Sequence, residues 1–328
     1  MAEAKTDQRP RQSTVAEHLA GTKDSWHGTI SDDGPFKPEK DRYHMYIGLF
    51  CPFAHRANLV RRIKGLEDVI PMSIVYFKAD PEYKGRYSVP ALWDTKTNTM
   101  VNNESADLLR NFQTAFDDLL TQEGKAKEAS THLYPEHLRE KIDSICEWMG
   151  DNLNSGVYKA GFAPDQETYG KNVIPVFAAL NKLEKIVKDH GGPFALGSEL
   201  TEVDIRLFPT LIRFDTVYVQ HFKCNLGTIR HDYPVLNNYM KGMYWGENEV
   251  VLGDGSRQKV TAFGPDTVDF KHIKENYTKS HYDVNPKAIT PRGPWPDIEK
   301  GFEKNWSRLV AGEVDMPEVL EQERQLPK

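Results

Sequence analysis

Cys51 is the residue of this sequence best placed to do chemistry, because Pro52 follows it and a helical pattern begins there. Proline suits the first position of a helix, where its missing N–H costs no hydrogen bond. The free amides and the positive dipole end of a helix N-terminus favour a thiolate. His55 and Arg56 are expected to add positive charge nearby. The pattern predicts a reactive cysteine with a lowered pKa; a buried structural cysteine is the alternative reading.

The residue three positions after Cys51 decides which redox chemistry is open to the thiol. That residue is Ala54, so the segment lacks the second cysteine of a C-x-x-C pair. A single thiol can form a mixed disulfide, and it then needs an external thiol for its release. Glutathione is the abundant cytosolic candidate. The sequence therefore predicts a monothiol site that uses glutathione.

The elements around Cys51 are predicted to hold it at a junction between a strand and a helix. Residues 43–49 form a nearly continuous apolar run, which is typical of a strand covered on both faces. After the cysteine, Ala57, Val60 and Ile63 recur at helical spacing, and Gly65 is a stop signal.

Composition and charge limit the classes of function. The chain has 328 residues, 39% of them hydrophobic and 27% charged, as in soluble globular proteins of about two domains. Its net charge of −6 argues against nucleic acid as the main partner. No apolar run reaches the roughly 18–20 residues of a membrane helix, and no signal peptide is apparent. Cys51, Cys146 and Cys224 are too few for a disulfide scaffold, so a reducing cytoplasm is expected.

The order of the elements after Cys51 is that of a thioredoxin-like domain. A second run rich in β-branched residues is expected to lie parallel to the first strand, because a helix joins the two. Two shorter runs around a turn predict a hairpin, and a helix with Leu109, Phe112 and Phe116 on one face follows. The three predicted strands after the helix are 69–76, 87–93 and 99–101.

Two features of this domain suit a peptide ligand. Val89-Pro90 precedes the hairpin strand, where a proline is expected at a strand start or after a cis bond. A cis bond would turn the backbone of Val89 toward the thiol, where a peptide could pair with it as an added strand. Glu104-Ser105 begins a helix, and its carboxylate and hydroxyl suit a γ-glutamyl group. Ordinary helix capping is the alternative for this pair.

From about residue 130 the pattern changes to successive helices. Thr201 and Asp204 are spaced as a capping box, and Pro209 is expected to bend the helix that follows. The stretch 245–263 is interpreted as a loop insertion. His221 and Cys224 lack the spacing of a zinc site, so no metal is expected. The predicted helices cover about 138–153, 173–187, 205–212, 233–243 and 267–279.

These segments resemble the glutathionyl-hydroquinone reductases, also called Xi-class glutathione transferases. The resemblance spans residues from about 43 to 291 in the order of the family. It is carried by residues 49–56, 88–94, 101–105, 156–162, 200–208, 213–219, 221–226 and 272–281.

The resemblance implies a glutathione transferase fold, of the α/β plus all-α class, in a cytoplasmic homodimer. Its substrates would be glutathione and a small aromatic compound of quinol type, with no metal, nucleic acid or membrane partner. The expected parts are an N-terminal arm (1–40), a thioredoxin-like glutathione-binding domain (41–122), a helical substrate-binding domain (130–285) and a C-terminal tail (286–328).

The resemblance also implies a reaction, the removal of glutathione from glutathionyl-hydroquinones. Cys51 would attack the thioether sulfur, and a second glutathione would release oxidised glutathione from the resulting mixed disulfide. Val89, Pro90, Glu104 and Ser105 match the glutathione-binding positions, with Pro90 as the cis-proline.

Tyr158, Tyr218 and Tyr277 match tyrosines that surround the aromatic part of the substrate in this family. Two departures from the family pattern bear on that substrate. Phe53 stands where the family has Trp, and only residues 77–87 separate the second strand from the hairpin strand. A Gly-Trp-x-Phe stretch, whose Trp reaches glutathione in the family, is therefore absent.

Two other classes of function remain open from the sequence. One is a glutathione transferase, lyase or isomerase of specialised small-molecule metabolism, which would use Cys51 on another electrophile. The other is a non-catalytic binder of aromatic ligands. A binder has no need of Cys51 at a helix N-terminus, and this favours an enzyme.

Overall fold

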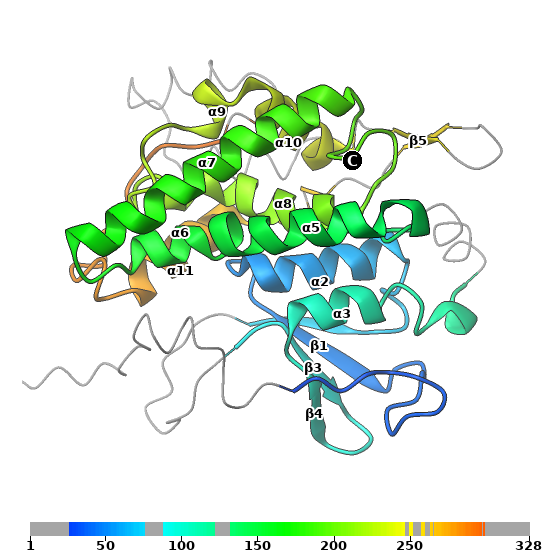
Figure 1. The fold of residues 1–328 in the computed structure, drawn as a ribbon. Helices are drawn as coiled ribbons and strands as arrows, with labels where there is room; N and C mark the ends of the chain where they lie inside the picture. The colour runs from blue at the N-terminus through cyan, green and yellow to red at the C-terminus, as the bar shows by residue number, and fades with distance from the viewer. Residues whose placement is uncertain are drawn as a thin grey trace, which may run out of the picture.

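The computed structural model describes residues 26–75, 88–121, 132–246, 249–251, 257–259, 263–264, 266–296 and 298. Two parts are visible in it (Figure 1). A small sheet with two helices is built from the N-terminal part of the chain, and a larger body of helices lies beside it. The predicted boundary between the domains, at 122–130, lies outside the described residues, so the domain limits stay a prediction.

The sheet has four strands in the order β2-β1-β3-β4. β1 runs parallel to β2 and antiparallel to β3, and β3 forms the hairpin with β4. The parallel pair confirms the predicted helical crossover. The strands are β1 (Tyr43–Ile47), β2 (Met72–Ile74), β3 (Ala91–Asp94) and β4 (Thr99–Asn102).

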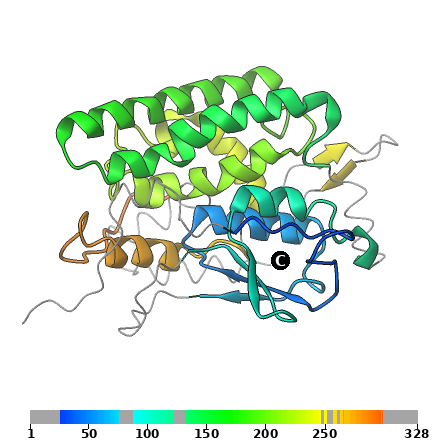
Figure 2. The same ribbon diagram turned by 60° about the horizontal axis from the view of Figure 1, so that its bottom comes forward.

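One face of β1 is buried and the other is not. Tyr43, Met45 and Ile47 point into the core, whereas His44 is half-buried and Tyr46 is exposed. The buried face lies toward helix α2 (Pro52–Ile63), which also packs against α3 (Ser105–Asn111) (Figure 2). The prediction of a strand covered on both faces is therefore wrong for the described residues.

A buried ion pair ties the start of β1 to the end of β3. The guanidinium of Arg42 donates to both carboxylate oxygens of Asp94, at 2.7–3.1 Å, and the Asp94 side chain is fully buried. The same carboxylate accepts the backbone N–H groups of Lys96 and Thr97. This hydrogen bonding outweighs burial and lowers the pKa of Asp94 to about 2.

The helices of the second part follow the predicted periodicities, with two interruptions. The long helix expected over 138–153 is divided into a short 3-10 turn, a helix and a π-helical turn. A second π-helical turn, η4, continues α8. The elements are η2 (Glu136–Leu138), α5 (Arg139–Met149), η3 (Gly150–Asn154), α6 (Gly156–Gly161), α7 (Gln166–His190), α8 (Glu202–Arg213), η4 (Phe214–Tyr218), α9 (Ile229–Asp232), α10 (Pro234–Trp245) and α11 (Phe270–Ser280).

Several of the predicted helix signals are present in the structure. Thr201 and Asp204 form the capping box at the start of α8, and Pro209 lies inside this helix. α7 begins at Gln166, so Pro175 lies well inside it.

The stretch 245–263 contains a small hairpin, β5 (Glu249–Val251) with β6 (Arg257–Lys259), where a loop was predicted; its tip lies outside the described residues. After Asn111 the chain leaves α3 through a turn and η1 (Asp117–Leu119), although Phe112 and Phe116 are still buried.

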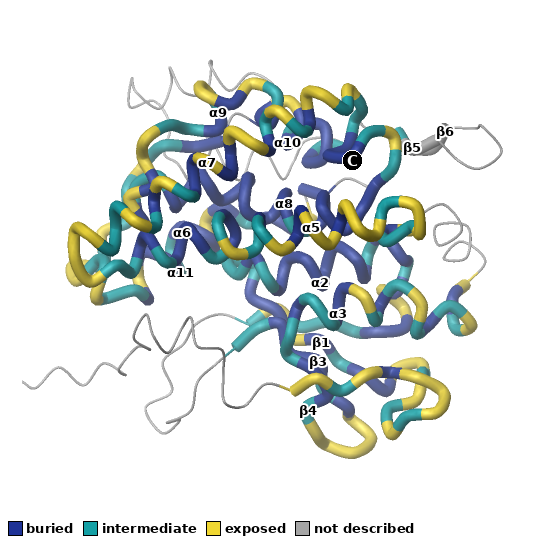
Figure 3. The backbone as a smooth tube through the Cα atoms, viewed as in Figure 1, coloured by how far each residue is buried: buried dark blue, intermediate teal, exposed yellow. Residues whose placement is uncertain are grey.

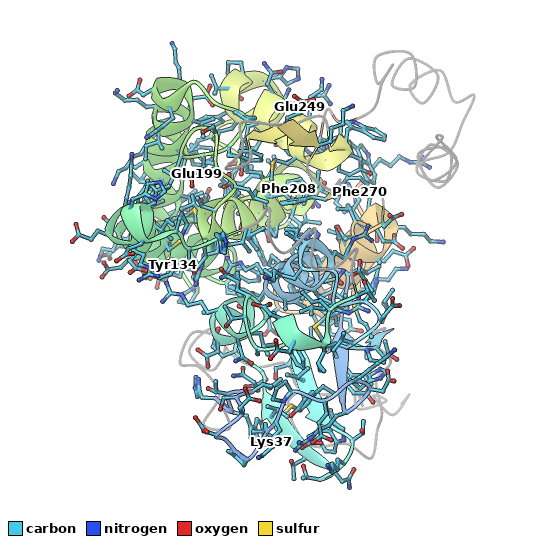
Figure 4. The ribbon with its side chains drawn as sticks, turned by 90° about the vertical axis from the view of Figure 1, so that its right-hand side faces the viewer. Lys37, Tyr134, Glu199, Phe208, Glu249 and Phe270 are labelled. Atoms are coloured by element: carbon cyan, nitrogen blue, oxygen red, sulfur yellow. The ribbon has the colours of Figure 1, made fainter. Side chains whose placement is uncertain are left out.

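The core is continuous between the two parts, because α2 packs against α8. Figure 3 shows the dark, buried tube running through both helices. Phe208 of α8, near the middle of Figure 4, lies edge to face with Phe263 and with the ring of His55 in α2. Within the described residues, no helix is long and apolar enough to span a membrane.

Candidate active site

Cys51 lies between β1 and α2, as the sequence predicted. It is the N-cap residue of α2, Pro52 is the first residue of the helix, and Sγ accepts the N–H of Ala54 at 3.5 Å. The thiol in turn donates to the carbonyl oxygen of Val89 at 3.3 Å. Ala54 occupies the position where a second cysteine would close an internal disulfide. The cysteine is free and only partly accessible to solvent.

The expected lowering of the Cys51 pKa is not met. Burial raises the pKa of the thiol, and this outweighs the N–H groups of Ala54 and Phe53, which act in the opposite direction. The guanidinium groups of Arg213 and Arg56 also lower it, to a smaller extent. The helix terminus is present as predicted, but the density of protein around the sulfur was not visible in the sequence.

The two residues expected to add positive charge near the thiol differ from each other. Burial, with a smaller contribution from the Arg213 charge, lowers the pKa of His55 well below its ordinary value, so this imidazole is neutral at physiological pH. Arg56 keeps its charge, although burial lowers its pKa to about 10. Its guanidinium stacks on the ring of Phe53, 4.7 Å from the centroid. The predicted charge of His55 is therefore wrong, and that of Arg56 is right.

Val89 faces the thiol with its backbone. The Val89–Pro90 peptide bond is cis, as predicted. The Val89 carbonyl accepts the Cys51 thiol, and the Val89 N–H makes no hydrogen bond within the part of the chain that the structure describes. A peptide lying beside Val89 would find one backbone donor and one acceptor, as at the edge of a sheet.

Glu104 and Ser105 begin α3 in the same domain. Glu104 is the N-cap residue, and its carboxylate accepts the N–H of Ala106 at 3.2 Å. The Ser105 side chain is buried, and its hydroxyl lies 3.5 Å from the Glu104 carboxylate. Capping, the alternative reading, is thus present. The bond to Ala106 and the contact with Ser105 both involve the same carboxylate oxygen of Glu104.

The three predicted tyrosines come together although they lie in three separate elements. Tyr158 is in α6, Tyr218 ends η4 and Tyr277 is in α11. The Tyr277 hydroxyl is hydrogen-bonded to that of Tyr158 and lies 3.3 Å from that of Tyr218. All three rings are buried, which is the first cause of their raised pKa values. We call this set the tyrosine trio.

The trio lies on the side of the helical part that faces Cys51. The negative charge of an ionised Cys51 is among the causes that raise the pKa of Tyr158 and Tyr218. The ring of Phe53, two residues after the cysteine, is 6.1 Å from the ring of Tyr158. Phe53 thus occupies the boundary between the thiol and the trio. The shortened stretch 77–87, the other departure from the family, lies outside the described residues.

Arg213 is a residue of this site that the sequence did not single out. Its guanidinium is fully buried and donates to the carbonyl oxygens of Leu49 and Phe50, at 2.6 and 2.9 Å. These two residues lead directly into Cys51. The contact joins positions more than 160 residues apart, and no local pattern in the sequence indicates such a pairing.

The arrangement brings the thiol, the backbone of Val89 and the tyrosine trio into one region, and the start of α3 lies in the same domain as the thiol. A thiol at a helix N-terminus supplies a nucleophile. The backbone of Val89 and the start of α3 offer hydrogen bonds to a peptide with a free amine. The tyrosine trio holds three phenol hydroxyls close together, and each hydroxyl can both donate and accept a hydrogen bond. These features fit glutathione beside an aromatic compound that carries oxygen.

Comparison with known proteins assigns both parts of the chain. Residues 50–115 match the family described as "Glutathione S-transferase, N-terminal domain". Residues 136–242 match the family described as "Glutathione S-transferase, C-terminal domain".

Individual relatives are similar over most of the chain. "Glutathione S-transferase omega-like 2" of Schizosaccharomyces pombe is 46% identical over 295 residues, covering 80% of this chain and 89% of that protein. "Glutathionyl-hydroquinone reductase YqjG" of Escherichia coli is 40% identical over 299 residues, covering 81% and 84%. The crystal structure of the Xi glutathione transferase ECM4 from Saccharomyces cerevisiae in complex with glutathione superposes with a TM-score of 0.73 at 36% identity, covering 84% of this chain and 98% of that chain.

Proposed function

The chain belongs to the glutathione S-transferase family and, within it, to the Xi class of glutathionyl-hydroquinone reductases, and from this membership we propose that it removes glutathione from glutathionyl-hydroquinones through a mixed disulfide on Cys51. It is a glutathione-dependent enzyme of the reductase and transferase type. The observation that carries the finer proposal is the position of a single thiol between the Val89 backbone and the tyrosine trio.

The first half-reaction uses the Cys51 thiolate as the nucleophile. It attacks the sulfur of the aryl thioether, so a sulfur–sulfur bond forms and the sulfur–carbon bond breaks. The electron pair of the broken bond goes to the ring carbon, which takes up a proton and leaves as the hydroquinone. The trio can donate hydrogen bonds to the quinol oxygens as charge develops on the ring.

The second half-reaction restores the thiol. A second glutathione, as thiolate, attacks the mixed disulfide and leaves as oxidised glutathione, with Cys51 released. The sum is one glutathionyl-hydroquinone plus one glutathione giving one hydroquinone plus one oxidised glutathione. Because Ala54 supplies no resolving thiol, the external glutathione is required at every turnover.

We propose that Val89, Glu104 and Ser105 hold the glutathionyl group of both half-reactions. The Val89 backbone would pair with the peptide of glutathione, and Pro90 would keep this backbone turned toward the thiol. The carboxylate of Glu104 would accept the α-amine, while the Ser105 hydroxyl at the start of α3 would donate to the α-carboxylate. The ECM4 structure with glutathione supports the placement of this ligand in the Xi class.

The proposal is tested with a glutathionyl-hydroquinone and glutathione as substrates. We expect equal amounts of hydroquinone and oxidised glutathione by chromatography. Incubation with oxidised glutathione alone should add one glutathionyl group, which peptide mass spectrometry should locate on Cys51. Cys51→Ser should abolish both results. Cys224→Ser is the matched control, because that thiol is fully buried and its pKa is raised to about 12 by burial.

Release of hydroquinone at the normal rate by Cys51→Ser would overturn the mixed-disulfide route. A protein that conjugates glutathione to a nitroaromatic compound but releases no hydroquinone would be a transferase in the ordinary sense. The two assays run side by side separate these outcomes.

A further inference from the structure

Arg213 is the last residue of α8, and its three guanidinium nitrogens donate to four acceptors. Nε donates to the carbonyl of Phe50 at 2.9 Å and Nη2 to the carbonyl of Leu49 at 2.6 Å. Nη1 donates to the carbonyl of Pro209 at 2.8 Å and to Nδ1 of His55 at 3.1 Å. An arginine can only donate, so each of these four partners must accept.

This requirement fixes every hydrogen in a chain of hydrogen bonds. His55 accepts at Nδ1, so its one ring hydrogen is on Nε2, which therefore donates to the Thr267 hydroxyl at 2.7 Å. The hydroxyl in turn donates to the carbonyl of Phe263. The neutral state of His55, favoured by its burial, is the state that this chain needs. The loop before Cys51 is thereby connected to the segment that returns from the 245–263 insertion.

Arg213 is connected to both parts of the site, the tyrosine trio and the loop before Cys51. The π-helical turn η4 begins at the next residue and ends at Tyr218 of the trio. On the other side, Cys51 follows directly after the two carbonyls that Arg213 holds. Of the charged groups that lower the pKa of Cys51, Arg213 has the largest effect. The side chain of Arg213 thus contacts the loop before Cys51, and its backbone leads into the turn that ends at Tyr218 of the trio.

We propose that Arg213 is a positioning residue that holds the Leu49–Phe50 loop and so sets both the place of the Cys51 thiol and its distance from the tyrosine trio. The inference rests on the proposed function only in taking Cys51 as the nucleophile. It assigns a cause, within the helical part, for the reactivity of a thiol that belongs to the other part.

The experiment compares lysine and methionine at two buried arginines. Arg61, which lies on α2, is the matched control. Like Arg213 it is buried, and it donates to two backbone carbonyls, those of Ile70 and Glu67. It holds a turn remote from the thiol. Each variant is measured for thermal stability, for the pH dependence of Cys51 alkylation, and for turnover of the mixed disulfide of glutathione and 2-mercaptoethanol.

Arg213→Met removes both the charge and the hydrogen bonds. We expect the midpoint of Cys51 alkylation to rise by about one pH unit, which means about tenfold slower alkylation below the midpoint. Arg213→Lys keeps the charge, but an ammonium cannot reproduce the planar fork that spans both carbonyls. We expect its alkylation midpoint to stay near that of the wild type while kcat falls by about tenfold or more, with KM for glutathione unchanged.

The inference is overturned if the alkylation midpoints and kcat values at position 213 equal those of the matching Arg61 variants. In that case Arg213 only stabilises the fold. If Arg213→Met does not fold, the comparison of kcat between Arg213→Lys and Arg61→Lys still decides the question. Alkylation needs no quinol, so a protein that releases no hydroquinone but shows these shifts would refute the proposed substrate and leave this inference standing.

Discussion

The thiol of Cys51 donates a hydrogen bond to the backbone carbonyl of Val89, at a distance of 3.3 Å. A thiolate cannot make this bond, because it has no hydrogen to donate. In the protein without glutathione, the resting state is therefore the thiol. The raised pKa of Cys51, caused first by burial, is consistent with this geometry.

We predict that alkylation of Cys51 in the absence of glutathione has its midpoint above the value of about 8.5 of an unperturbed cysteine. Below this midpoint the thiolate fraction, and with it the rate, should rise about tenfold per pH unit. Rates measured with iodoacetamide between pH 6 and 10, with adducts located by mass spectrometry, provide the test. A midpoint well below 8.5 would show that the helix amides and the two arginines outweigh burial.

A second prediction concerns the start of α3. Glu104→Gln keeps an oxygen for the N–H of Ala106, so the helix cap should survive. It removes the charge that we assign to the glutathione amine, and a hydrogen bond to a charged group contributes about 1.5–3 kcal/mol. We expect KM for glutathione to rise about ten- to hundredfold, with little change in melting temperature.

Asp107→Asn is the control for Glu104→Gln. Asp107 is an acid of the same first turn, and its carboxylate is paired with His27 and Asn102 on the surface. An equal rise of KM in both variants would mean that the general charge of the turn acts on glutathione, and that Glu104 has no specific contact.

A third prediction concerns stability of the sheet. Asp94→Asn removes the buried one of the two carboxylates that pair with the guanidinium of Arg42, and breaking a buried pair in this way costs about 3–5 kcal/mol of unfolding free energy. Glu39→Gln removes a half-exposed partner of the same arginine and should cost much less, because solvent screens this pair. Urea unfolding of the two variants measures the difference. Similar small losses in both would show that water replaces the Asp94 carboxylate.

The same carboxylate gives a pH dependence with a defined sign. Its pKa is about 2 in the folded protein, against an ordinary value of 3.8. The folded state therefore binds this proton less readily than the unfolded state, and the contribution to stability is present above pH 4 and lost as the pH falls toward 2. The loss is about 2 kcal/mol by this shift. Asp94→Asn should lack this part of the acid dependence.

The sequence was sufficient to predict the parts of the site that depend on local pattern. Cys51-Pro52 marked a helix start, and Val89-Pro90 limited the proline to a strand start or a cis bond, of which the family resemblance implied the cis bond. The capping box of α8 was visible for the same kind of reason. Each is decided by residues within a few positions of one another.

The features that the sequence did not predict depend on contacts between distant residues. Arg213 meets Leu49 only after the two parts have packed, and the hydrogen bond from Arg213 to Nδ1 of His55 requires this imidazole to be neutral. The π-helical turn at Gly150–Asn154 also escaped prediction, since apolar spacing of three and four residues does not reveal an extra residue in one turn. The expectation that the three tyrosines meet came from the family resemblance, because their spacing along the sequence does not indicate it.

The last prediction concerns the tyrosine trio. Each Tyr→Phe change keeps the ring and removes one hydroxyl, which is worth about 0.5–1.5 kcal/mol, or roughly two- to tenfold in rate. Tyr277 is bonded to both of the others, so removal of its hydroxyl takes one hydrogen-bond partner from each of them. We therefore expect the largest loss of kcat/KM for a glutathionyl-hydroquinone in Tyr277→Phe, and smaller losses in Tyr158→Phe and Tyr218→Phe.

The contrast between two substrates separates a chemical role of the trio from a structural one. The mixed disulfide of glutathione and 2-mercaptoethanol has no ring oxygen, so its turnover should be unchanged in all three variants. Tyr233→Phe is the control, because the Tyr233 hydroxyl donates to Asn181 at 3.0 Å, within the helical part and outside the trio. It should change neither reaction. Equal losses on both substrates would mean that the trio only shapes the fold around Cys51, and no loss on either would place the aromatic substrate elsewhere.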